Sequence, residues 1–98
     1  MYTNKSIFKE LYMPRICYFL GISIHMYYDE HNPPHFHAKY NGYRGKFTLS
    51  SLKYSAGNLP PRIIGLVTEW AELHEEELLD NWNNLKETGK YKKINPLV

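Results

Sequence analysis

The chain has 98 residues, and its length, composition and charge exclude several classes of protein. Domains usually span about 100–200 residues, so the chain supplies one domain at most and a two-domain enzyme is excluded. Hydrophobic residues make up 43% and charged residues 22%, proportions that exclude a disordered or membrane-spanning chain. The single cysteine, Cys17, and the absence of an apolar run of the signal-peptide kind favour a cytoplasmic protein.

The net charge of +2 hides an uneven distribution of charge along the chain. Residues 1–57 carry seven basic and three acidic side chains, whereas residues 58–89 carry two basic and seven acidic ones. Four of the five histidines and eight of the nine tyrosines also lie within residues 1–57. The basic part of the chain is therefore also its aromatic and titratable part.

The first half of the chain predicts strands. Residues 1–12 are interpreted as an N-terminal arm that precedes a single domain over residues 13–98. β-Branched and aromatic residues alternate with polar ones over residues 16–28, which predicts a strand. Pro33 and Pro34 then interrupt the pattern because they lack N–H donors, and a second strand is predicted over residues 35–40.

Asn41-Gly42 predicts a two-residue hairpin turn that leads into a third strand over residues 43–49, because a type I′ turn needs positive φ at both central positions. Such a turn fixes the pairing, from Tyr40 opposite Tyr43 at the turn outwards. One face of the hairpin is then apolar. The opposite face is polar and carries His35, His37, Lys39, Arg44, Lys46 and Thr48.

The second half of the chain predicts a helix. Pro60-Pro61 favours a helix start, and apolar residues recur every three or four positions from Ile63 to Leu85. We expect one long helix over about residues 60–88, or a helix broken near residues 73–75. Residues 92–97 could add a further strand at the edge of the sheet. The predicted fold class is α+β, with three to four antiparallel strands, the helix packed on one face and the other face open.

The open face predicts an anion site. Lys39 is expected opposite Arg44, and two like charges in that position repel each other unless an anion lies between them. Lys46 opposite His37 also disfavours the protonated imidazole. The predicted ligand is a phosphate-bearing molecule, either RNA, the leading candidate, or a small ligand, and no cofactor is required. Its predicted binding residues are His25, Lys39, Arg44 and Lys46.

The same face allows acid–base chemistry, and His35, His37 and Tyr27 are the candidate catalytic residues. Two imidazoles beside a tyrosine and several cations meet the needs of metal-free RNA cleavage through the ribose 2′-hydroxyl. A metal-independent ribonuclease is therefore one hypothesis, and a protein without enzymatic activity is the other.

Two further hypotheses concern metal and protein partners. His31, His35 and His37 could together hold Zn²⁺ or another divalent transition metal, because strand residues two apart share a face. The acidic helix flank or an open sheet edge could instead dock a protein partner without catalysis, and a homodimer is also open. His74, on the apolar helix stripe, is expected to be a core histidine with a hydrogen-bond partner.

Several stretches follow one recognisable pattern. They are Met13-Pro14-Arg15-Ile16, Gly21-Ile22, His25-Met26-Tyr27, His31-Asn32-Pro33-Pro34-His35-Phe36-His37-Ala38, Leu59-Pro60, Glu69-Trp70-Ala71-Glu72-Leu73-His74 and Ile94-Asn95-Pro96-Leu97. Over residues 13–97 the chain resembles the family called domain of unknown function 4160. The resemblance implies a small bacterial protein, sometimes part of toxin–antitoxin-like pairs with a partner encoded nearby, and it implies no particular activity.

Overall fold

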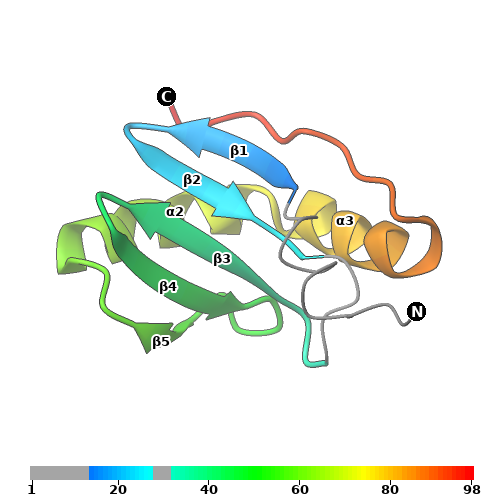
Figure 1. The fold of residues 1–98 in the computed structure, drawn as a ribbon, viewed down its shortest axis with the longest axis horizontal. Helices are drawn as coiled ribbons and strands as arrows, with labels where there is room; N and C mark the ends of the chain where they lie inside the picture. The colour runs from blue at the N-terminus through cyan, green and yellow to red at the C-terminus, as the bar shows by residue number, and fades with distance from the viewer. Residues whose placement is uncertain (1–13, 28–31) are drawn as a thin grey trace, which may run out of the picture.

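Five antiparallel strands form one sheet in which each strand lies beside its neighbours in the sequence (Figure 1). The computed structural model describes residues 14–27 and 32–98, so the expected arm over residues 1–12 lies outside the described residues. The strands are β1 (Arg15–Phe19), β2 (Ile22–His25), β3 (His35–Tyr40), β4 (Tyr43–Thr48) and β5 (Tyr54–Gly57). Two helices follow, α2 (Pro61–Leu73) and α3 (Glu75–Thr88), which confirms the α+β class.

The β3–β4 hairpin has the predicted register. Asn41 and Gly42 have φ values of 48° and 84°, the positive angles that a type I′ turn requires. Tyr40 lies opposite Tyr43, and the pairing continues without a shift to His35 opposite Thr48. The separation of polar and apolar side chains between the two faces therefore holds for this hairpin.

The prediction of a single strand over residues 16–28 is wrong, because a second hairpin turn divides that segment. Leu20 and Gly21 form the turn with φ values of 51° and 80°, and Phe19 pairs with Ile22. The resulting strands β1 and β2 run antiparallel to each other. The end of the predicted strand, at residue 28, lies outside the described residues.

The sheet edges also differ from the prediction. β5, which the sequence analysis did not predict, pairs with β4 and places Gly57 opposite Gly45. Residues 92–97 do not form the predicted edge strand, although this segment does lie beside β1. The Ile94 N–H donates to the Ile16 carbonyl at 2.8 Å, and the Lys93 ammonium donates to the Arg15 carbonyl at 2.8 Å.

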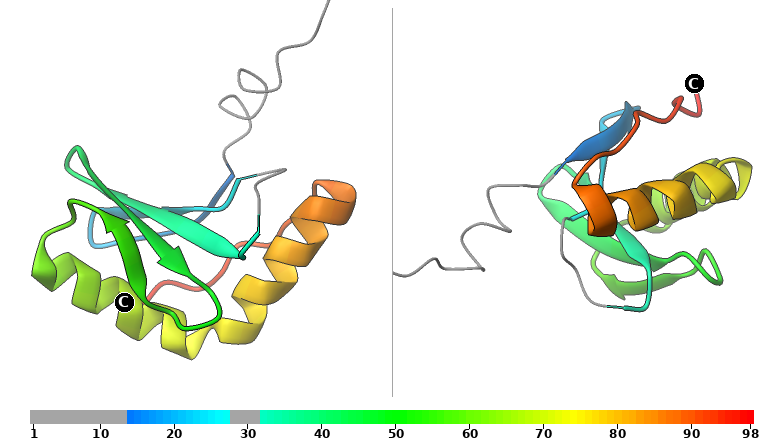
Figure 2. Two further views of the ribbon diagram at one scale, coloured as in Figure 1. Left: turned by 90° about the horizontal axis from the view of Figure 1, so that it is seen from below. Right: turned by 90° about the vertical axis from the view of Figure 1, so that its right-hand side faces the viewer.

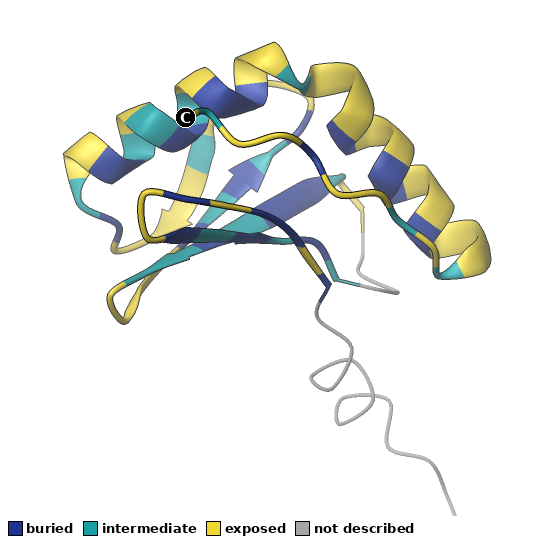
Figure 3. Cartoon of the chain, turned by 90° about the horizontal axis from the view of Figure 1, so that it is seen from above, coloured by how far each residue is buried: buried dark blue, intermediate teal, exposed yellow. Residues whose placement is uncertain are grey.

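The predicted helical region is confirmed and is broken at His74, between α2 and α3. Figure 2 shows α2 along one face of the sheet and α3 turning away past the end of the strands. Trp70 of α2 packs with its ring centroid 5.9 Å from those of both Phe19 and Phe36. Buried positions of the helices and the sheet face each other across this core (Figure 3).

Candidate functional site

The sheet has a second face, opposite α2, and the helices in the described part of the chain leave most of it uncovered (Figures 1 and 2). Its end at His35 lies against Trp82 of α3. We call it the open face. The strand pairing arranges its side chains in two rows that cross β1 to β4. The first row is Arg15, His25, His37 and Lys46, and the second row is Tyr18, Ser23, Lys39 and Arg44.

The second row places Lys39 directly opposite Arg44 on the neighbouring strand. Partial burial and, secondarily, the charge of Arg44 lower the pKa of the Lys39 ammonium. No residue of β1 to β5 is an aspartate or a glutamate, so these five strands carry no negative side chain to neutralise the pair. An anion placed between Lys39 and Arg44 would remove the repulsion and form charge-assisted hydrogen bonds with both.

The first row brings together two of the predicted histidines, His25 and His37, with the predicted binding residue Lys46. His37 lies between His25 on β2 and Lys46 on β4, as the register requires. The Tyr27 ring stacks on the His37 ring with centroids 4.5 Å apart and planes inclined by 17°. The structure thus places Tyr27, His25, His37 and Lys46 on one continuous surface, which also adjoins the Lys39–Arg44 pair.

His35 lies on the same side of β3 as His37, as predicted, but it is buried and not exposed to solvent as expected. Its residue is only 4% exposed, because Trp82 of α3 lies over it with ring centroids 5.2 Å apart. The carbonyl of Pro33 accepts a hydrogen bond of 2.8 Å from His35 Nδ1, which therefore carries a proton. The His35 and His37 rings still meet edge to face, with centroids 5.1 Å apart.

The metal hypothesis also depends on His31, which lies outside the described residues. Within residues 14–27 and 32–98, no group of three or more histidine, cysteine or acidic side chains comes close enough to hold a metal ion. The Zn²⁺ site proposed for His31, His35 and His37 therefore stays a prediction.

Two residues of the open face, Arg15 and Tyr18, were missed by the sequence analysis. A β-bulge interrupts the pairing between Arg15 and Cys17, so residues 15 and 18 project to the same side of β1. The Arg15 guanidinium carbon lies 4.9 Å from the centre of the Tyr18 ring, a cation–π contact. The signal in the sequence that could have revealed these two residues was Gly21. It marks the turn between β1 and β2, and that turn determines which side of β1 faces outwards.

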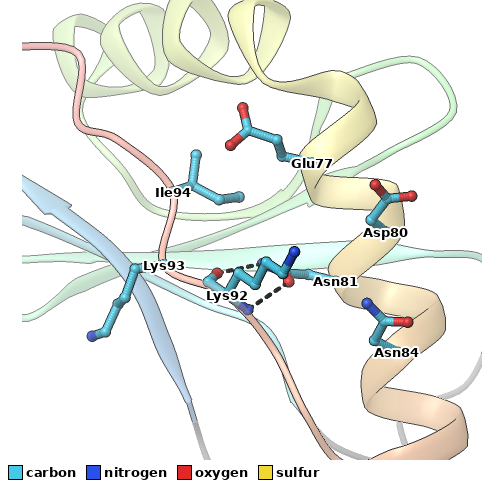
Figure 4. A pocket seen from close by; sticks show the side chains of 7 residues that line it. All are labelled: Glu77, Asp80, Asn81, Asn84, Lys92, Lys93 and Ile94. Atoms are coloured by element: carbon cyan, nitrogen blue, oxygen red, sulfur yellow. Dashed lines mark hydrogen bonds between the residues drawn. The ribbon is translucent and has the colours of Figure 1, made fainter.

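A pocket of about 240 Å³ lies elsewhere, between α3 and the C-terminal segment (Figure 4). Its buried polar side chain is Asn81, which donates to the Lys92 carbonyl at 2.8 Å and accepts from the Lys92 N–H at 2.9 Å. These hydrogen bonds attach the C-terminal segment to α3, so we assign Asn81 a structural role. His74 has the expected hydrogen-bond partner, since its Nδ1 lies 2.5 Å from a carboxylate oxygen of Glu77, but it is partly exposed at the break between α2 and α3 and does not belong to the buried core as predicted.

Comparison with known proteins gives one match. No curated protein and no solved structure matches the chain. No helix in the described residues is long and apolar enough to cross a membrane. A family model described as "Domain of unknown function (DUF4160)" matches residues 21–83, a span that includes β2 to β5, all of α2 and most of α3. The chain therefore belongs to the domain of unknown function 4160 family.

Proposed function

We propose that the open face binds a phosphate-bearing ligand and that this ligand is RNA. The observation that supports the proposal is the pairing of Lys39 with Arg44 on strands that contain no acidic residue. Two cations in that position destabilise the sheet unless an anion shares them. Arginine binds phosphate oxygens through two parallel N–H groups, and lysine contributes a compact positive charge beside it.

The extent of the surface favours a nucleic acid over a small phosphate ligand. His25, His37 and Lys46 lie in the adjoining row, so polar and cationic groups cover three strands. Neighbouring strands are about 4.8 Å apart, and the cationic surface therefore spans about 10 Å across the sheet. A single phosphate would occupy only part of that surface, whereas a nucleic acid places several phosphates along it.

The test compares two double variants that remove the same charge from different surfaces. Lys39→Gln with Arg44→Gln removes the pair, and Arg62→Gln with Lys90→Gln removes one arginine of α2 and one lysine that follows α3, both of which are exposed and lie outside the sheet. Binding of fluorescent RNA is measured by anisotropy between about 50 and 200 mM salt. We expect the first variant alone to weaken binding and to flatten the salt dependence, by about 0.7–0.9 in logarithmic slope per lost phosphate contact.

The proposal would be contradicted by wild-type protein that binds RNA with no salt dependence, or by equal effects of the two double variants. The first result would show that cations do not hold the ligand, and the second that only net charge matters.

RNA cleavage by the same face remains a separate prediction. His35 is covered by Trp82, whereas His37 is half-buried, so His37 is the more exposed of the two histidines predicted to be catalytic, although its Nε2 atom is buried. RNA incubated with the protein in EDTA is examined for cleavage on a gel. Cleavage that His37→Gln abolishes without reducing RNA affinity would support catalysis, and intact RNA would identify a protein that binds without cutting.

A further inference from the structure

An exposed aromatic ring begins the row that ends in the two facing cations. Tyr18 is 54% exposed on β1, and the strand pairing places it opposite Ser23. Ser23 lies opposite Lys39, which in turn lies opposite Arg44. From β1 to β4, the row therefore presents an aromatic ring, a small polar residue and two positive charges, one on each strand.

The bulge in β1 places a cation beside the ring. Because residues 15 and 18 project to the same side, the Arg15 guanidinium packs 4.9 Å from the Tyr18 ring centre. The backbone of Arg15 is fixed as well, since its carbonyl accepts a hydrogen bond of 2.8 Å from Lys93 in the C-terminal segment. Tyr18 is therefore a solvent-accessible ring with a cation beside it, and it does not belong to the buried core.

The spacing of the row suits a strand of nucleotides. With strands about 4.8 Å apart, Tyr18 lies roughly 10 Å from Lys39 and roughly 14 Å from Arg44, measured between backbones. Each nucleotide of one strand in a stacked nucleic acid adds about 3.4 Å along the helix axis, so this distance covers a few nucleotides. A base resting on Tyr18 would thus leave neighbouring phosphates within reach of the two cations.

We propose that Tyr18 stacks an unpaired base and that the ligand of the open face is therefore single-stranded RNA. This inference rests on the proposed function, because it specifies the form of RNA that the same face binds. In a duplex each base is already stacked between its neighbours, and an exposed tyrosine has no base face to contact. In a single strand the base faces are available, and stacking on an aromatic ring tolerates any base.

The experiment uses the full chain and variants of two tyrosines that lie on opposite faces of the sheet. Tyr18→Ala removes the ring from the open face, and Tyr43→Ala removes a ring of similar exposure, 43%, from a position paired with Tyr40 on the side of β3 and β4 that packs on α2. The probes are a single-stranded oligouridine of about twelve nucleotides containing one 2-aminopurine, and the same strand annealed to its complement. Affinity is measured by anisotropy, and stacking is measured by quenching of the 2-aminopurine fluorescence.

We expect Tyr18→Ala to weaken binding of the single strand about 5- to 100-fold and to abolish the quenching, and Tyr18→Phe to retain both. Tyr43→Ala should leave single-strand binding unchanged, and duplex binding should be weak and insensitive to all three changes. Circular dichroism melting confirms that each variant is folded, which the exposure of both rings favours.

The outcomes separate this inference from the proposed function. If Tyr18→Ala binds the single strand as the wild type does while Lys39→Gln with Arg44→Gln weakens it, the stacking inference is overturned and RNA binding stands. Tighter binding of the duplex than of the single strand overturns it too. If the wild type binds neither probe, both proposals are wrong, and the surface would then be tested for a protein partner.

Discussion

Lys39 and Arg44 face each other directly across β3 and β4, two cations in a position where sheets usually pair opposite charges or apolar groups. The pKa of Lys39 is lowered, first by its partial burial and then by the charge of Arg44. The folded protein therefore carries an unfavourable interaction that an anionic ligand would relieve. The repulsion that destabilises the free protein would thus favour binding of an anion.

Replacement of Lys39 by glutamine should make the free protein slightly more stable. Its ammonium binds a proton less readily in the folded state than in the unfolded state, where the pKa is about 10.4. The unfavourable charge is fully present below the folded pKa and disappears as the pH rises towards the unfolded value. We expect Lys39→Gln to gain a few tenths of a kcal/mol at pH 7, and the gain to shrink towards about pH 10.4.

The measurement is urea denaturation over this pH range, with Lys53→Gln as the control because Lys53 is exposed between β4 and β5. A gain for Lys39→Gln that is equal at neutral and alkaline pH would argue against the charge as its cause.

The two hairpins show how far local sequence determines this sheet. Asn41-Gly42 predicted the β3–β4 turn and its register because both residues tolerate positive φ. The β1–β2 turn has the same geometry, yet its first central residue is Leu20, a residue that rarely adopts a φ of 51°. Tertiary packing of β1 and β2 therefore overrides the local preference at Leu20, and the alternation of residues 16–28 concealed the turn.

Leu20→Asn should stabilise the protein, and Asn41→Leu should destabilise it. Leucine in a left-handed conformation costs up to about 1 kcal/mol more than asparagine, and Leu20 is 54% exposed, so its side chain contributes little packing. Each change should shift the free energy of unfolding by up to about 1 kcal/mol, in opposite directions. Denaturant titration of the two single variants tests this. A loss of stability in Leu20→Asn would mean that contacts of the Leu20 side chain outweigh the cost of its left-handed backbone conformation.

The burial of His35 could not be predicted from the strand pattern. Alternation places His35 and His37 on the same side of β3, and the register bears this out. The difference between them arises from α3, whose Trp82 covers His35 at the end of the sheet. A contact between residues 47 positions apart in the sequence depends on the direction α3 takes after the break at His74, which local periodicity does not specify.

The close approach of β5 to β4 makes Gly45 intolerant of a side chain. A Cβ atom at this position would lie 2.7 Å from the Tyr54 ring and 2.8 Å from Cγ of Leu59. Neither group can move freely, because the Leu59 N–H donates to the Tyr54 hydroxyl at 3.2 Å and Leu59 is buried. Gly45→Ala should therefore lower the stability by about 1–3 kcal/mol.

Gly65 provides the matched control for that change. It lies on the exposed side of α2, and a Cβ atom there would meet nothing within 4 Å. Alanine favours helix over glycine, so Gly65→Ala should raise the stability by about 0.5–1 kcal/mol. Thermal melting that shows the two glycine substitutions shifting the midpoint in the same direction would refute this account of β5 packing.

Asn81 should be the residue on which the attachment of the C-terminal segment depends. It is 2% exposed, and it pairs with both the carbonyl and the N–H of Lys92 (Figure 4). Asn81→Leu fills a similar volume but leaves these two backbone groups without their partner, at a cost of about 1–3 kcal/mol. Asn84→Leu is the control, because Asn84 lines the same pocket but is exposed.

Hydrogen exchange at the amides of Lys92 and Ile94 should accelerate in Asn81→Leu and stay unchanged in Asn84→Leu. Equal protection of both amides in the two variants would mean that the Ile94 hydrogen bond to Ile16 holds the segment without Asn81.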